Sequence, residues 1–232
     1  MKEFKKLRIG EIVADDFRAA EVFKKEGIDF CCGGNQSLEE VAKEKDLNIA
    51  ELENKLNNLE TVVQGSQPNY KDWNLDFLCD YIVNEYHSKV YRVLPQIMDY
   101  LNKIVQVHGA GHPELKEIAD LFSLVNTELP IHQQQEENVF FPAIKEALSS
   151  NSAKAKEIVN SQIALMMEEH ELIGGTVDKI SLLSNHYSVP DDGCNTYHVT
   201  YKLLEEFEED LHVHVHLENN ILYPKALNLT KS

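Results

Sequence analysis

The sequence predicts an all-α protein, in which an antiparallel four-helix bundle follows a small helical domain that contains two adjacent cysteines. Apolar residues recur every three or four positions over long stretches of residues 73–232, which is the period of an amphipathic helix. No strand-like alternation of any length competes with this period. Because short turns connect the long helical stretches, neighbouring helices are expected to run antiparallel and to form a bundle.

Residues 1–64 are predicted to form the small helical domain. Two capping patterns open helices in it, one at Ser37 and one at Asn48, each with a glutamate three residues later. The glycines of the stretch IDFCCGGNQ indicate a loop before the first of these helices. A turn-forming run of Gly, Ser, Gln, Pro and Asn predicts a linker over residues 65–72, before the bundle of residues 73–232.

Four long helices are expected in the bundle, at residues 74–107, 113–148, 152–183 and 191–227. Proline lacks a backbone N–H and clashes with the preceding turn, so Pro95 predicts a kink in the first helix and Pro142 a bend in the second. Pro224 lies near the end of the fourth helix. Cys79 falls on the apolar face of the first helix, where we expect it in the core.

The chain is strongly acidic, with 22 Lys and Arg against 39 Asp and Glu and a net charge of −17. Phosphate groups repel such a surface, which argues against non-specific binding to nucleic acid or to anionic membranes. No apolar run approaches the roughly 18–20 residues of a membrane span, and the first residues lack the apolar segment of a secretory signal. Four cysteines are too few for a disulfide framework. We therefore expect a cytoplasmic protein.

An internal repeat links the second and fourth predicted helices. Each contains an acid, a histidine four residues later and a glutamate four residues after that, followed by Asn and Pro. The matching residues are Glu128, His132 and Glu136 in one copy, and Asp210, His214 and Glu218 in the other. The first and third helices add His87 and His170, at nearly equal distances before the histidines of the repeat. The bundle is therefore expected to consist of two related helical hairpins.

The spacing of these residues predicts a binuclear metal site. Residues four apart share one helix face, so each His-x-x-x-Glu pattern presents an imidazole beside a carboxylate, and the other two histidines can meet them. Mixed donors of this kind suit iron better than calcium or magnesium, and the lack of thiolate disfavours structural zinc. Four imidazoles and two bridging carboxylates suit two iron ions with an oxo or hydroxo bridge. Zinc or manganese stays open on the ligands alone.

Further polar residues flank the proposed ligands. Glu128 and Asp210 lie one turn before the histidines of the repeat. They either orient an imidazole or hold a proton or an incoming iron ion, or they are solvated acids of an acidic chain. His212 and His216 lie two residues from His214, so they point to other faces of the helix, where we expect surface positions.

Cys31 and Cys32 lie in the glycine-rich loop. Their Cα atoms are only about 3.8 Å apart across a trans peptide, which is too close for a relaxed disulfide. One interpretation is a redox or metal-handling pair, exposed by Gly33 and Gly34, that shuttles iron or exchanges thiols with a client protein. The other is a packed pair of small apolar residues.

Together, the repeat and the loop FCCGG resemble the RIC (repair of iron centres) proteins of the YtfE/ScdA type, which are hemerythrin-like di-iron proteins. The stretch GIDFCCGGNQSLEEVAKEKDL is similar to their N-terminal cysteine domain, and DYIVNEYH, HQQQEENVFFP, MEEHELIG and HVHLENNILYP are similar to their iron-binding helices. The resemblance implies a hemerythrin-like bundle, a homodimer, and a role for Glu169 in lining an iron or substrate path. It places the family's ligands on His87, His132, Glu136, His170, His214 and Glu218.

The resemblance also implies a function, the repair of iron–sulfur clusters damaged by oxidative or nitrosative stress through iron donated to iron–sulfur proteins. Such a donor is a repair protein rather than a classical enzyme. Two alternatives stay open: a hemerythrin-like protein that binds or senses O2 or NO, and an enzyme that reduces NO. The thiol loop favours repair, because a simple gas carrier has no need of it. The sequence leaves the iron oxidation state and the client proteins open.

Overall fold

The computed structural model describes residues 3–59 and 68–231, and these residues form helices and connecting turns without a β-strand. An isolated β-bridge joins Arg8 and Ser37. Of the helices described, none combines the length and the apolar character needed to cross a lipid bilayer. The chain divides into two compact units, one of residues 1–78 with 215–232 and one of residues 79–214. The expected linker at 65–72 begins outside the described residues, which resume at residue 68.

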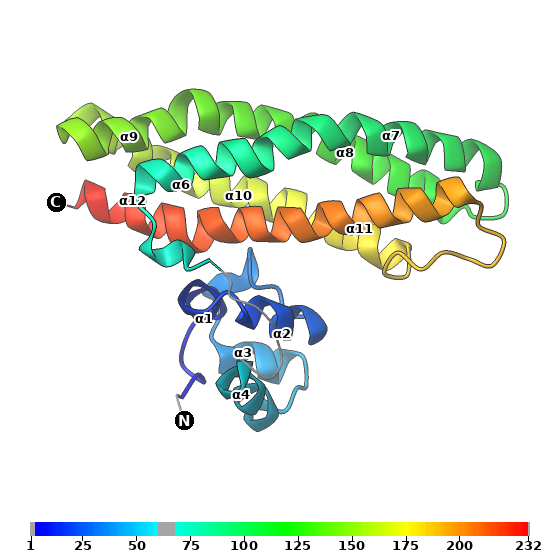
Figure 1. Cartoon of the computed structure of the whole chain (residues 1–232), viewed down its shortest axis with the longest axis horizontal. Helices are drawn as coiled ribbons and strands as arrows, with labels where there is room; N and C mark the ends of the chain where they lie inside the picture. Colours follow the sequence, from blue (N-terminus) through cyan, green and yellow to red (C-terminus); the bar gives the residue numbers. More distant parts are fainter. Residues whose placement is uncertain (1–2, 60–67, 232) are drawn as a thin grey trace. The chain divides into compact units, whose positions relative to one another are not determined.

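The long helices of the bundle occur where the sequence predicts them. Figure 1 shows α7, α8, α10 and α11 running side by side, and contacts join α8 to both α7 and α10. The segments, in chain order, are α6 Leu75–Tyr81, η3 Ile82–His87, α7 Ser88–His108, α8 Glu114–Gln135, η4 Glu136–Phe140, α9 Phe141–Ser150, α10 Ala153–Leu183, α11 Asn195–His216, η5 Leu217–Leu222 and α12 Tyr223–Thr230. The all-α bundle is therefore confirmed.

Wider helical turns interrupt the predicted helices. The segments η3, η4 and η5 are π-helical, and α9 and α12, which follow η4 and η5, have Pro142 and Pro224 in their first turn. Because proline offers no N–H to the preceding turn, a helix can adopt a different hydrogen-bond pattern just before it. Helix α7, in contrast, is continuous through Pro95, and α8 is continuous through Pro130.

Apolar side chains fill the unit of residues 79–214. Leu94 and Leu101 of α7 are buried, and Phe122 of α8 meets Phe207 of α11 edge to face with ring centroids 5.5 Å apart. Such aromatic pairs add to the free energy gained by burying their area. Cys79 is fully buried, as the apolar face predicts.

The small helices of the other unit begin with the predicted caps. They are α1 Ile9–Asp15, α2 Ala19–Lys25, η1 Gly33–Asn35, α3 Leu38–Glu44, α4 Ile49–Asn57 and η2 Tyr70–Asp72. The Ser37 hydroxyl accepts from the Glu40 N–H at 3.3 Å, and the Ser37 N–H donates to the Glu40 carboxylate at 2.9 Å. Asn48 caps α4 in the same way. Helix α1 packs against η1 and η5 within this unit.

Replacing Phe122 by alanine tests the packing of the bundle. The substitution leaves a cavity against Phe207, so we expect the free energy of unfolding to fall by about 3–5 kcal/mol. Leu124→Ala, two residues away on a side chain that is 41% exposed, is the control and should change it by less than about 0.5 kcal/mol. Equal losses in the two variants, measured by denaturant unfolding, would contradict this packing.

Candidate metal centre

Four buried imidazoles meet in two pairs at the middle of the bundle. The Nε2 atoms of His87 in η3 and His214 in α11 lie 3.1 Å apart, and those of His132 in α8 and His170 in α10 lie 2.8 Å apart. A metal–nitrogen bond of about 2.1 Å places two ligand atoms at right angles on one ion roughly 3 Å apart. Each pair therefore has the spacing that a single metal ion requires.

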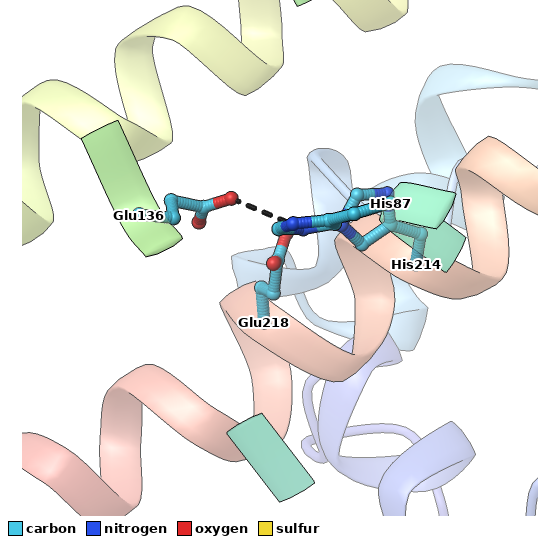
Figure 2. Close-up of side chains that lie close together, drawn as sticks. All are labelled: His87, Glu136, His214 and Glu218. Atoms are coloured by element: carbon cyan, nitrogen blue, oxygen red, sulfur yellow. Dashed lines mark hydrogen bonds and ion pairs between the residues drawn. The ribbon is translucent and has the colours of Figure 1, made fainter. Parts of the chain in front are cut away.

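A buried carboxylate lies between the two pairs. The Glu136 Oε2 atom is 3.4 Å from His87 Nε2 (Figure 2). The same atom is also 3.4 Å from His132 Nε2. Glu218 follows His214 by four residues, in segment η5, which directly continues α11, and it too is fully buried. With both glutamates, each histidine pair forms a group of four side chains whose ligand atoms lie within 4.8 Å of one another. Both carboxylates belong to both groups.

The donor set fits divalent or trivalent metal cations. It consists of imidazole nitrogens and carboxylate oxygens, without thiolate, in an apolar helical core. Burying a carboxylate is costly unless positive charge compensates for it, and two carboxylates are buried here among imidazoles. A metal ion on either side of Glu136 would supply that charge. The six residues the repeat predicts as ligands are thus brought to one place.

Two further carboxylates contact the Nδ1 atoms of two of these imidazoles, on the side of each ring that faces away from the paired Nε2 atoms. Glu137 Oε1 lies 2.8 Å from His87 Nδ1, and Glu169 Oε2 lies 2.7 Å from His132 Nδ1. A carboxylate that accepts a hydrogen bond from Nδ1–H fixes the tautomer of the imidazole, so the Nε2 lone pair faces the site. Burial, opposed by the charge of His170, raises the pKa of Glu169.

These contacts bear on the flanking acids, for which the sequence left an orienting role and a solvated position open. The structure gives the orienting role to Glu169 rather than to Glu128, which is exposed. Asp210 forms an ion pair with Lys89. Glu137 was not predicted at all, although it directly follows Glu136 in the repeat, because the matching position of the second copy is Asn219.

Asp29 forms hydrogen bonds with the loop that contains Cys31 and Cys32, which we call the thiol loop. Its Oδ1 accepts from the N–H groups of Cys31 at 2.9 Å and Cys32 at 3.0 Å, and its Oδ2 accepts from the N–H of Gly33 at 2.7 Å. The Cys31 thiol also donates to Asp29 Oδ1 at 3.1 Å. The two sulfur atoms are 3.9 Å apart, which is too far for a disulfide bond. Asp29 and both thiols form a further group of possible metal ligands.

The two thiols differ in exposure, contrary to the expectation that Gly33 and Gly34 expose both. Gly33 and Gly34 form the short helical turn η1 with Asn35, and Gly34 is buried. Cys31 is only 4% exposed, whereas Cys32 is partly exposed. The hydrogen bond to Cys32, burial and the nearby charge of Asp29 raise the pKa of Cys31 well above its usual value. Cys31 therefore stays a neutral thiol at neutral pH.

His216 is another departure from the expected surface position. Its ring is fully buried, with its centroid 5.7 Å from that of Phe30 and 5.9 Å from that of Phe17. Burial lowers its pKa to about 4, so the imidazole is neutral at physiological pH. His212 is partly exposed, 3.8 Å from Asp178.

A helical bundle with paired histidines around shared buried glutamates is the arrangement of hemerythrin-like metal-binding proteins. Comparison with known families agrees, because residues 80–226 match the model described as the hemerythrin HHE cation binding domain. Residues 5–60 match the ScdA_N model, which is described as a domain of unknown function.

Relatives with curated names match nearly the whole chain. The iron–sulfur cluster repair protein ScdA of Staphylococcus epidermidis is 30% identical over 94% of this chain and 96% of its own length. The iron–sulfur cluster repair protein YtfE of Pectobacterium atrosepticum is 34% identical over the same shares. YtfE of Yersinia pestis is 31% identical over 97% of this chain and 98% of its own length. The chain belongs to the ScdA/YtfE family, which confirms the resemblance.

Replacing Glu137 by alanine tests whether the carboxylates that contact the histidine Nδ1 atoms support metal binding. Without its partner, the His87 ring loses its fixed tautomer and orientation, so we expect affinity for Fe²⁺ to fall by roughly 10–100-fold in a chelator competition. Glu128→Ala, which removes an exposed carboxylate from the same helical segment, is the control and should bind Fe²⁺ as the unaltered protein does. Equal affinities of all three proteins would show that Glu137 does not support the site.

Proposed function

We propose that this protein repairs iron–sulfur clusters damaged by oxidative or nitrosative stress, by donating iron held at the site of paired histidines. The relatives named above are iron–sulfur cluster repair proteins. The observation that carries the proposal is one chain that combines a buried imidazole–carboxylate site with a dithiol loop. The site would hold two non-haem iron ions with an oxo or hydroxo bridge, on His87, His132, Glu136, His170, His214 and Glu218.

The proposed ligands are suited to iron that must be released to another protein. Imidazole and carboxylate ligands can be protonated or displaced, unlike a closed set of thiolates. Ferrous iron carries one positive charge fewer than ferric iron, so Glu136 and Glu218 would attract it less strongly. The outer acids Glu137 and Glu169 keep the imidazoles aimed at the site, ready for reloading.

In this proposal, the thiol loop passes the iron from the metal site to the client protein. Cys32 is the more exposed thiol, so it can contact a client or accept an iron ion, with Asp29 and Cys31 as neighbouring ligands. The proposal divides the chain into a domain of residues 1–64, which contains this loop, a linker at 65–72 and the iron-holding bundle at 73–232. We propose that a homodimer acts in the cytoplasm on iron–sulfur proteins with damaged clusters.

A second function, binding of O2 or NO, is favoured by a small cavity beside His214. Its volume is about 10 Å³, and its walls include Tyr86, Val90 and Phe207. A cavity of this size admits one water-sized molecule. A carrier or sensor would use the cavity and the metal pair but not the thiol loop, and an NO reductase would turn NO over there.

A reactivation assay separates these functions. The iron-loaded protein is incubated with an enzyme whose iron–sulfur cluster was inactivated by NO, and recovered activity is measured. We expect recovery with the unaltered protein, loss of recovery and of bound iron with Glu136→Leu, and loss of recovery with retained iron in Cys31→Ala/Cys32→Ala. Cys194→Ala removes an exposed thiol outside the loop and should recover activity normally.

Two results would contradict repair by this route. Full recovery with Cys31→Ala/Cys32→Ala would exclude the thiol loop from the transfer. Reversible changes of the absorption spectrum with O2 or NO, without any recovery of the inactivated enzyme, would establish the gas-binding function instead. Steady consumption of NO under the same conditions would establish a reductase.

A further inference from the structure

The side chain of Asn220 reaches into the thiol loop. Its Nδ2 atom lies 3.2 Å from the carbonyl oxygen of Phe30 and 3.1 Å from that of Cys31. The same nitrogen is 3.2 Å from Nδ1 of the buried His216. Asn220 belongs to η5, and both η5 and the thiol loop belong to the same compact unit.

The contact requires a hydrogen-bond donor at this position. Two carbonyl oxygens and an imidazole nitrogen surround the atom, and all three can accept a hydrogen bond. The amide nitrogen of asparagine has two hydrogens to offer, whereas the isosteric carboxylate of aspartate has none. The geometry therefore selects asparagine for its chemistry as well as for its shape.

Two glycines make room for this amide. A Cβ atom at Gly10 would lie 2.1 Å from the Asn220 Oδ1 atom, and one at Gly34 would lie 2.6 Å from it. Neither glycine has a positive φ angle, so the absence of a side chain, rather than backbone freedom, is what the contact needs. Helix α1 and the turn η1 thus approach Asn220 from two sides.

The internal repeat offers a comparison within the same chain. Asn138 is the residue that matches Asn220 in the first copy. It is exposed, and its amide donates to the carbonyl of Gln134 one turn back on its own helix, at 2.8 Å. The contact with the thiol loop is therefore particular to Asn220 and does not follow from the repeat.

The loop is held from both sides of Cys31. Asp29 accepts from the Cys31 N–H and thiol, and Asn220 donates to the Cys31 carbonyl. These bonds leave Cys31 buried and the adjacent Cys32 partly exposed. A loop released from Asn220 would lose two of the bonds that keep the two thiols unequal.

We propose that Asn220 is the positioning residue of the dithiol, which it holds so that Cys32 meets a partner first and Cys31 stays in reserve. The proposal deepens the role of the thiols and rests on the proposed function for its biological meaning. Since Asn220 lies two residues after Glu218, the helical segment that supplies a predicted metal ligand also sets the accessibility of the thiols.

Alkylation of the thiols tests this directly. Iodoacetamide reacts with the full chain in Cys31→Ala and Cys32→Ala backgrounds, and mass spectrometry gives the rate at each remaining cysteine. We expect Cys32 to react much faster than Cys31. Asn220→Ala and Asn220→Asp should each raise the rate at Cys31 by about ten-fold, because partly buried hydrogen bonds that oppose opening are lost. Asn138→Ala is the matched control and should leave the rate unchanged.

The other two cysteines are internal references. Cys194 is exposed, and a hydrogen bond to His108 lowers its pKa to about 7, so it should react rapidly in every variant. Cys79 is fully buried in the bundle, so its alkylation would report unfolding. Gly10→Ala is a second route to the same release, since its Cβ displaces the Asn220 amide while alanine favours helix α1.

The outcomes divide clearly. A raised rate at Cys31 in Asn220→Ala, Asn220→Asp and Gly10→Ala, with Cys79 still protected, supports the proposal. A slow Cys31 in Asn220→Asp would overturn it, because packing without donation would then suffice. Unchanged rates in all three variants, or rates that rise only together with that of Cys79, would overturn it as well. The assay needs neither iron nor a client, so its failure is distinct from failure of the repair function.

Discussion

The burial of Glu136 among four imidazoles is the constraint on which the rest of the site depends. A carboxylate in the core of a helical bundle is costly unless positive charge or hydrogen bonds compensate for it. Its Oε2 atom is equally distant from one histidine of each pair, so a single oxygen faces both halves of the site. Metal ions bound beside Glu136 would supply compensating positive charge.

π-Helical turns occur at three of the side chains that surround this site. His87 ends one π-helical segment, Glu136 begins another, and Glu218 lies in a third. Wider turns of this kind are frequent at functional sites, because they re-aim side chains without ending the helix. The prolines that follow two of these segments fit the altered hydrogen bonding. The third of these segments also carries Asn220, so one stretch of chain contains both a predicted metal ligand and the contact with the thiol loop.

The sequence predicts the parts of this arrangement that depend on local spacing. The helices, the Ser37 cap and the ligand set follow from periods of three or four residues and from an internal repeat, which chance rarely duplicates. The orientation of His87 by Glu137, the burial of Cys31 and the reach of Asn220 depend on residues that are distant in sequence and meet only when the chain folds. The adjacent glycines predicted a loop that exposes both thiols, yet a side chain at Gly34 would collide with Asn220, which occupies the space beside it.

The number and place of the metal ions is the most direct test of the central claim. Crystals of the iron-loaded protein, measured on both sides of the iron absorption edge, locate each iron by its anomalous scattering. We predict two iron peaks per chain, one bonded to His87 and His214 and one to His132 and His170, with Glu136 between them. A single peak, or iron bound away from these four histidines, would contradict a binuclear centre.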